Sequence, residues 1–280
     1  MKELIVTADD YGMSRGVNDA INAGISCGLI TSTNVMTNME FYREAAKLRT
    51  MDVSVGIHWT ISAGKPVLPP EEIKTLVNSK GEFYSYPEFR SRYRKGQISN
   101  EDIVKELKAQ YTRFVEICGE PDYWNTHQNT HVDFGVFRLF VDTAKELGIL
   151  KMRSHQRIYV PGSDNTQGKS LKWRLSEPIK ASILNVWQNN AHKKGIASPD
   201  GRIVCLKKSD ENNLAYVFKS IRWGKNQVGE YVIHPATVDD SPYFGRIVEQ
   251  RIKEWQQFTS DETRRIIQCE ELELARFDIL

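Results

Sequence analysis

The segment LIVTADDYG, residues 4–12, sets the expected fold class. Residues 4–8 form an apolar, β-prone run that is too short for a helix, and the carboxylates Asp9 and Asp10 end it. Apolar residues then recur at helical spacing, at Val17, Ala20, Ile21, Ile25 and Leu29. A short buried strand followed by an amphipathic helix is the repeating unit of α/β proteins.

The same alternation continues along the chain. Further strands are expected at residues 33–36, 53–57, 122–126, 151–153, 202–206 and 230–233. Helices are expected at residues 101–118, 136–147 and 259–270, and Ser99 and Thr259 are candidate N-caps for the first and last of these. Strands that alternate with helices predict a parallel sheet, either open or closed.

Length and composition restrict the classes of protein that fit. The chain has 280 residues, is 40% hydrophobic and carries a formal net charge of +2, so neither a basic nucleic-acid binder nor a disordered chain is expected. A single domain over residues 1–280 is expected, because α/β barrels commonly take about 250 residues. We expect a cytoplasmic protein without a membrane segment, because Asp9 and Asp10 interrupt the N-terminal apolar run and the four cysteines form no CxxC pair.

Polar residues follow the expected strands. Asp9 and Asp10 end the first strand, and five of the six histidines come at or shortly after a strand, with His192 as the exception. Because the carboxyl ends of parallel strands face one opening, these side chains are expected to converge there. Any one histidine is better explained by a structural role, but the set together with two carboxylates favours a functional site.

The chemistry that suits this set is metal-assisted hydrolysis. One carboxylate and two imidazoles can hold a divalent metal with open positions, and a second carboxylate can take a proton from water. Neighbours on a strand point to opposite faces, so Asp9 and Asp10 can share a site only if a turn redirects one of them. His127 and His131, in the segment NTHQNTH at 125–131, have the spacing of some metal sites but lack the glutamate of HExxH peptidases.

The segments TADDYG (7–12), GIHWT (56–60), NTHQNTH (125–131), GIASPDG (195–201) and VIHPATVDD (232–240) together resemble the YdjC-like carbohydrate deacetylases, which include chitooligosaccharide deacetylases. The motifs occur in family order over nearly the whole chain. The resemblance implies a single-domain (β/α) barrel-like fold, a distorted TIM-type barrel. It also implies one divalent metal and hydrolysis of an N-acetyl group from an acetylated amino sugar, which releases acetate and a free amine.

By position, the resemblance implies roles for individual residues. Asp10, His58 and His127 match the metal ligands, and Asp9 matches the general base. His234 matches a histidine that protonates the departing amine. Three positions are expected to bind substrate or support the site. They are Arg153, expected to hold Asp9 or the substrate, His131, the replacement ligand should His58 or His127 not coordinate, and Asn129.

Two positions depart from the family pattern. Asn129 stands where a third histidine is usual, and Asn125 stands where an acidic residue is frequent. Three candidate ligands remain, so the metal is still expected, either zinc or magnesium with a lean to zinc. The departures leave the exact sugar open, and we expect a small carbohydrate substrate.

Two other functions fit parts of the pattern. A non-haem iron oxygenase also uses two histidines and one carboxylate, but it has no need of Asp9. A non-catalytic sugar-binding protein would fit the loss at Asn129 but would likewise not require Asp9. Residues 172–196 are expected to form a helix that either covers the barrel opening or packs outside it. A homodimer is the default among oligomers.

Overall fold

The first strand, β1 (Lys2–Tyr11), lies at the centre of the sheet in a computed structural model. The structure describes residues 1–133, 135–161, 171–205, 213–245 and 247–280. The strands run in the order β4-β3-β2-β1-β7-β6-β5, and β8 pairs with the start of β1, always in parallel. Their bounds are β2 Ser32–Val35, β3 Ser54–Trp59, β4 Trp124–Thr126, β5 Arg157–Val160, β6 Gly201–Cys205, β7 Val228–Ile233 and β8 Leu272–Leu274. The predicted parallel sheet is confirmed.

The sheet is curled, and β4 and β5 are the two ends of its strand order. Within the described part of the chain these two strands do not form a regular pair, so the barrel is not fully closed. Among the described residues, single bridges connect this gap, Trp124 with Met152 and Lys151 with Ala197. The strand predicted at 151–153 is therefore wrong, and the strand of this region begins at Arg157. The backbone N–H of Arg153 still donates to the carbonyl of Trp124 in β4, while its side chain reaches a carboxylate of β1. The result is the expected distorted (β/α) barrel.

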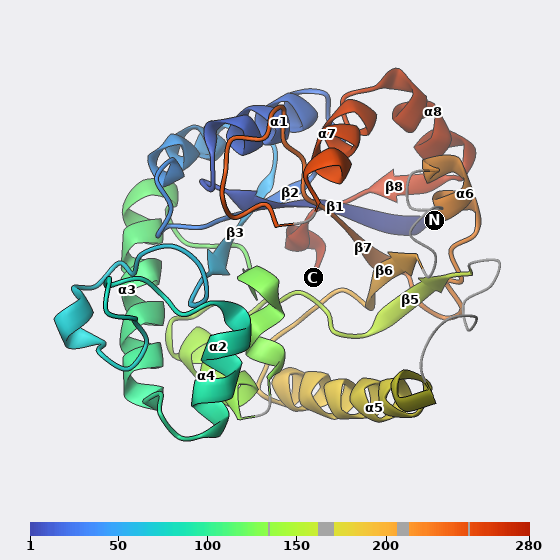
Figure 1. Ribbon diagram of the computed structural model, residues 1–280. Helices are drawn as coiled ribbons and strands as arrows, with labels where there is room; N and C mark the ends of the chain where they lie inside the picture. Colours follow the sequence, from blue (N-terminus) through green and yellow to red (C-terminus); the bar gives the residue numbers. More distant parts are fainter. Residues whose placement is uncertain (134, 162–170, 206–212, 246) are drawn as a thin grey trace.

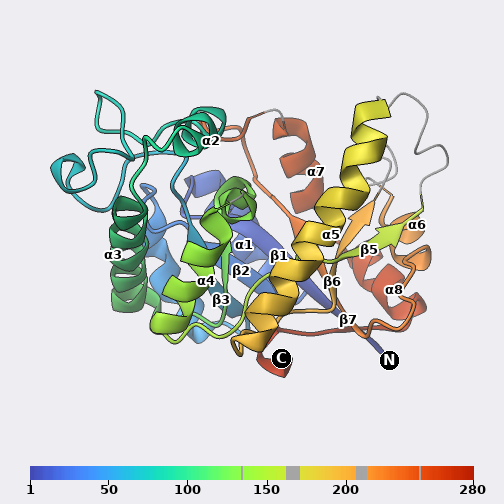
Figure 2. The ribbon, with the colours of Figure 1, turned by 90° about the horizontal axis from the view of Figure 1, so that it is seen from below.

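Most helices lie around the outer side of the curled sheet, whereas α2 lies beyond the carboxyl ends of the strands (Figures 1 and 2). The α-helices are α1 Arg15–Ser26, α2 Tyr86–Arg94, α3 Asn100–Cys118, α4 Val136–Glu146, α5 Leu171–Lys193, α6 Leu214–Lys219, α7 Val248–Gln257 and α8 Asp261–Cys269. Short 3₁₀ segments are η1 Tyr42–Thr50, η2 Pro70–Glu72, η3 His127–Val132 and η4 Phe277–Ile279. Ser99 caps α3 as predicted, by accepting a hydrogen bond from the backbone N–H of Glu101. Helix α8 is capped by Ser260 and not by Thr259, one residue later than expected.

The two faces of β1 pack differently. Leu4, Val6 and Ala8 belong to the large core, which also includes buried residues of α1, α3 and α4. Ile5, on the other face, packs with Tyr123 and Phe277, whose rings are stacked 3.7 Å apart. These three side chains fill the inside of the curled sheet near the start of β1. The period of two along a strand places Asp9 on this inner face, at the end where the site forms.

Helix α5 lies beside α4 at the side of the sheet, as both ribbon views show. Its side chains are described from Ala181 onward. The Trp187 ring stacks on Phe137 of α4 with centroids 5.1 Å apart, and Gln188 accepts a hydrogen bond from the backbone N–H of His155. The predicted helix is confirmed, and these contacts place this part of it against α4, outside the sheet.

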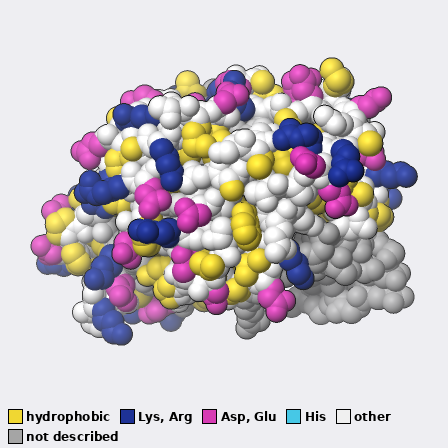
Figure 3. Space-filling view, turned by 90° about the horizontal axis from the view of Figure 1, so that it is seen from above, with side chains coloured by type: hydrophobic (Ala, Val, Ile, Leu, Met, Phe, Trp, Pro, Cys, Tyr) yellow, Lys and Arg dark blue, Asp and Glu magenta, His cyan; other side chains and the backbone are white. Residues whose placement is uncertain are grey.

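The surface shows no segregation of charge on the face drawn in Figure 3, where Lys and Arg side chains alternate with Asp and Glu. This agrees with a net charge of +2 over 280 residues. In the part of the chain that the structure describes, no helix has the length and apolar character needed to cross a bilayer.

Candidate metal centre and its surroundings

Asp10 reaches the inside of the sheet through a local distortion of β1. Its φ is +76°, in the left-handed region, and the register with β2 shifts between Ala8 and Tyr11. Aspartate tolerates this conformation better than most residues, although such backbone costs about 1–3 kcal/mol. The distortion solves the geometric problem of adjacent carboxylates. Asp9 and Asp10 both reach one buried polar site, where Asp9 contacts Arg153 and Asp10 contacts His58 and His127.

Asp10, His58 and His127 form a compact, buried group. Asp10 Oδ1 lies 3.3 Å from Nε2 of His58, which is in β3, and 3.1 Å from Nδ1 of His127, which follows β4. The three ligand atoms lie within 4.8 Å of one another. One carboxylate oxygen and two imidazole nitrogens suit a divalent cation, so these residues fit a metal.

Arg251 of α7 holds the second oxygen of Asp10. Its Nη2 lies 2.7 Å from Asp10 Oδ2, and both side chains are at most 2% exposed. Burial raises the pKa of Asp10, but the Arg251 guanidinium overrides this and, with hydrogen bonds from His127 and His58, holds the pKa well below its usual range. Asp10 is therefore ionised at neutral pH, and Oδ1 is the oxygen directed at the histidines.

Asp9 is clamped beside this group. Arg153 donates from Nη1 to Oδ2 and from Nη2 to Oδ1, both at 2.7 Å, and Asn34 donates to Oδ1 at 2.6 Å. Burial would raise the pKa of Asp9, but the paired Arg153 lowers it far below its usual value. Arg153 is itself balanced by Glu230, 3.0 Å away. Arg153 thus contacts Asp9, one of the two partners expected for it.

His234 follows β7 and stands at the exposed side of Asp9. Its Nε2 lies 3.7 Å from Asp9 Oδ2, and its side chain is one third exposed, at 33%. The backbone N–H of His234 donates a hydrogen bond to the Glu254 carboxylate at 2.6 Å. Burial lowers the pKa of His234 to about 4, against the opposing effect of Asp9 and Asp10, so the imidazole is neutral at pH 7.

His131 is not directed at Asp10. Its Nε2 lies 2.7 Å from Nε2 of His155, and its Nδ1 lies 2.5 Å from Thr126 Oγ1. Burial, followed by the charge of the neighbouring His155, lowers the pKa of His131 well below its ordinary value. His131 and His155 therefore form a neutral buried pair, separate from the three clustered ligand atoms.

Asn129 lies on the strained turn between His127 and His131. Gln128 and Asn129 have φ values of +56° and +52°, within η3, so the segment is not a regular helix. Asn129 Oδ1 accepts from Arg202 Nη1 at 3.5 Å. Arg202 of β6 has its pKa lowered to about 10 by burial and by the charge of Arg153.

The sequence reasoning missed four residues that build this site: Asn34, Arg202, Glu230 and Arg251. Glu230 and Arg202 could have been found from the sequence. Each is a charged residue within a predicted strand, and a charge buried there is costly unless it has a partner. Arg251 carried none, because a charged residue within VEQRIKEW is typical of a solvated helix face. Asn34 lay inside a predicted strand and was passed over.

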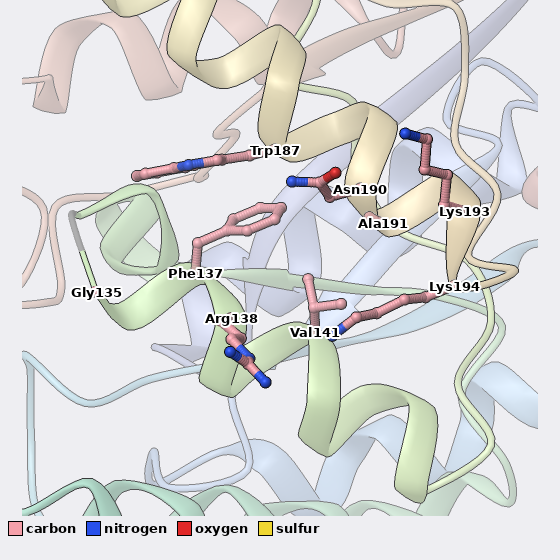
Figure 4. Close-up of a pocket in the computed structure, with 9 residues that line it drawn as sticks. All are labelled: Gly135, Phe137, Arg138, Val141, Trp187, Asn190, Ala191, Lys193 and Lys194. Carbon is pink, nitrogen blue, oxygen red and sulfur yellow. The ribbon is translucent and has the colours of Figure 1, made fainter.

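A separate surface pocket lies between α4 and α5 (Figure 4). The figure shows Phe137 and Trp187 on facing sides, with Arg138 and Lys194 at the rim. None of the predicted site residues lines it. The pocket is thus distinct from the carboxylate and histidine group.

The fold and the site define a barrel-like α/β protein with a buried carboxylate–imidazole group and a second ionised carboxylate. The family model for YdjC-like proteins matches residues 3–269, and the chain belongs to that family. The resemblance found from the motifs is therefore confirmed.

Two curated relatives match the chain over nearly its full length, and a third matches about half of it. The chain is 27% identical to a chitooligosaccharide deacetylase of Proteus mirabilis, over 94% of this chain and 93% of that protein. It is 25% identical to a carbohydrate deacetylase of Thermoanaerobacter pseudethanolicus over the full length of both. A carbohydrate deacetylase of Clostridium beijerinckii is 34% identical over 52% of this chain and 58% of its own length.

The fold is also found in a solved structure. A putative cellobiose-phosphate cleavage protein from Enterococcus faecalis superposes with a TM-score of 0.74 at 22% identity, over 99% of this chain and 98% of that one. The likeness supports the architecture of the whole chain.

Proposed function

We propose that this protein is a hydrolase that removes the N-acetyl group from an N-acetylated amino sugar or oligosaccharide and releases acetate, with a divalent metal. The observation that carries the proposal is the buried group of Asp10, His58 and His127 with a second ionised carboxylate, Asp9, beside it. The names of the full-length relatives, carbohydrate and chitooligosaccharide deacetylases, support the same reaction and the same substrate class.

Asp10, His58 and His127 would hold the metal. When bound, the metal supplies Lewis-acid polarisation of the acetyl carbonyl and of water, an effect worth several kcal/mol in the transition state. Two imidazoles with one carboxylate favour zinc over magnesium, which prefers oxygen ligands. Arg251 keeps Asp10 ionised and leaves Oδ1 facing the histidines.

Asp9 is the proposed base. Arg153 and Asn34 fix its carboxylate in one orientation and keep it ionised, so it is ready to accept a proton from the attacking water. The bidentate contact with Arg153 lowers the basicity of Asp9 while it fixes the direction of the carboxylate.

His234 is proposed to carry the proton to the leaving amine. An amide nitrogen must be protonated to leave near neutral pH. The His234 imidazole is neutral before reaction and lies 3.7 Å from Asp9, so it can receive the proton collected by Asp9 and give it to the nitrogen. Its partly exposed position at the site suits contact with substrate.

The test is acetate release from a panel of N-acetylated amino sugars, with and without a chelator. Chelator-sensitive release supports the proposal, and the Asp9→Asn variant should lose it while keeping the metal. Ferrous iron with oxygen-dependent turnover would instead indicate an oxygenase, and sugar binding without release from any substrate at any metal loading would indicate a binding protein.

A further inference from the structure

Asn125 is in contact with one of the proposed metal ligands. It lies in β4, in register with His58 of β3, and its amide is 2.5 Å from Nδ1 of His58. On its other side the amide faces Arg153 and Asn34. The side chain is buried, so both ends of the amide must be matched by these neighbours.

The neighbours determine which end of the amide faces which way. Arg153 can only donate hydrogen bonds. Asn34 has its own orientation fixed, because its oxygen accepts from the backbone N–H of Asp10 and its nitrogen donates to Asp9. The Asn125 oxygen therefore faces Arg153, at 3.1 Å from both Nη1 and Nη2, and Asn34 Nδ2 at 2.9 Å. Its NH₂ group then donates to Nδ1 of His58.

This arrangement fixes the tautomer of His58. If Nδ1 accepts a hydrogen bond, a neutral imidazole carries its hydrogen on Nε2. That nitrogen faces Asp10 Oδ1 at 3.3 Å and is the one positioned to bind a metal. Metal-ligating histidines ordinarily donate their other ring N–H to an acceptor, which is the reverse of what Asn125 offers.

We propose that Asn125 is a positioning residue that opposes metal uptake, because it holds His58 in the tautomer whose Nε2 is occupied by hydrogen. The proposal rests on the metal site of the proposed function. For His58 to bind the metal through Nε2, the amide of Asn125 must reverse. The reversed amide gives up its contacts with Arg153 and Asn34 and turns its NH₂ group toward their N–H groups. This residue thereby sets how tightly the chain holds its metal.

An aspartate at this position would remove the conflict. A carboxylate accepts on both sides, from Nδ1–H of His58 and from Arg153 and Asn34, without reversal. Partners of this kind change metal affinity about 10–100-fold. The Asn125→Asp variant should therefore bind Zn²⁺ about 10–100-fold more tightly than the wild type.

The tautomer can be measured directly in the metal-free protein. Nitrogen-15 NMR of histidine-labelled protein at pH 8 distinguishes a hydrogen on Nε2 from one on Nδ1, and the His58→Gln variant identifies the signal. The wild type should carry the hydrogen on Nε2 and Asn125→Asp should carry it on Nδ1. A hydrogen on Nδ1 of His58 in the metal-free wild type would overturn the proposal.

Zn²⁺ affinity, measured by competition with a chelating dye, supplies the second readout. Asn129→Asp is the matched control, since it adds the same charge near the site but its described contact is with Arg202 and not His58. We expect this control to change affinity by less than about threefold. Equal tightening by both aspartate variants would refute the proposal. Neither measurement uses substrate, so the result stands apart from whether acetate is released.

Discussion

Replacing Arg251 by methionine tests the electrostatic balance of the site. The change removes the guanidinium that lies 2.7 Å from Asp10 and leaves a carboxylate that is 1% exposed without its cation. Methionine keeps most of the apolar volume against the Phe244 ring, which lies 4.5 Å from the guanidinium carbon. The measured loss therefore reports mainly the unpaired charge.

Breaking a buried ion pair on one side costs about 3–5 kcal/mol. For a chain of this size, such a loss corresponds to a decrease in Tm of roughly 10 °C. We expect urea unfolding of the metal-free Arg251→Met variant at pH 7 to show a decrease in unfolding free energy of this size. Saturating Zn²⁺ should recover part of it, because a bound cation compensates Asp10 in place of the arginine.

The control is Arg138→Met, which breaks an exposed pair with Asp142 on α4. Exposed pairs contribute about 0–1 kcal/mol, so this variant should unfold almost like the wild type. If Arg251→Met lost less than about 1 kcal/mol, or if it equalled Arg138→Met, the claim that Arg251 compensates a buried charge would fail.

Three further predictions follow from the same contacts. Burial lowers the pKa of His155 from 6.5 to about 3, so the stability that the neutral imidazole contributes is present above pH 6.5 and is lost as the pH falls toward 3. The His155→Gln variant should therefore flatten the acid side of a plot of unfolding free energy against pH. An unchanged plot would contradict this prediction. Gly12 has φ +98°, and an added Cβ would lie 3.0 Å from the Tyr42 backbone, so Gly12→Ala should cost about 1–3 kcal/mol in a calorimetric comparison, whereas a neutral result would count against the turn. Zn²⁺ should raise the Tm of the wild type but not of Asp10→Asn, and equal shifts would place the metal elsewhere.

Much of the fold could be predicted because the strands are short, apolar and bounded by polar residues. Residues 4–8 predicted β1 because they form an apolar, β-prone run that is too short for a helix, although the strand extends from Lys2 to Tyr11. The strand near 151–153 was wrong because Met152 and Lys151 each make a single bridge, with Trp124 and Ala197, and the regular pairing starts at Arg157. Helix α7 was missed, since its buried residues include Arg251 and Glu254, which hide the apolar stripe that marks a helix.

The site was predictable where a residue with acid–base or metal-binding chemistry lies at or just after the end of a predicted strand. Asp9, Asp10, His58, His127, Arg153 and His234 were all named in advance, and the structure brings them together. Their roles in metal binding and catalysis stay predictions. The left-handed conformation of Asp10 was not readable, because any residue pair can continue a strand or turn, and only contacts with β2 decide.

The partner choices within the site depend on distances that no linear pattern contains. Arg251 is 241 positions from Asp10, and the orientation of Asn125 follows from Arg153 and Asn34 together. The homodimer stays a prediction, and light scattering would measure the oligomeric state.

In the proposed mechanism, a metal and Asp9 act as two separable parts of one hydrolytic site. The most direct test measures metal content and acetate release together in the wild type, Asp9→Asn and Asp10→Asn, on an N-acetylated oligosaccharide that the wild type deacetylates. We predict one equivalent of metal and release for the wild type, metal without release for Asp9→Asn, and neither for Asp10→Asn. Undiminished release by metal-loaded Asp9→Asn, or full metal content in Asp10→Asn, would contradict the account.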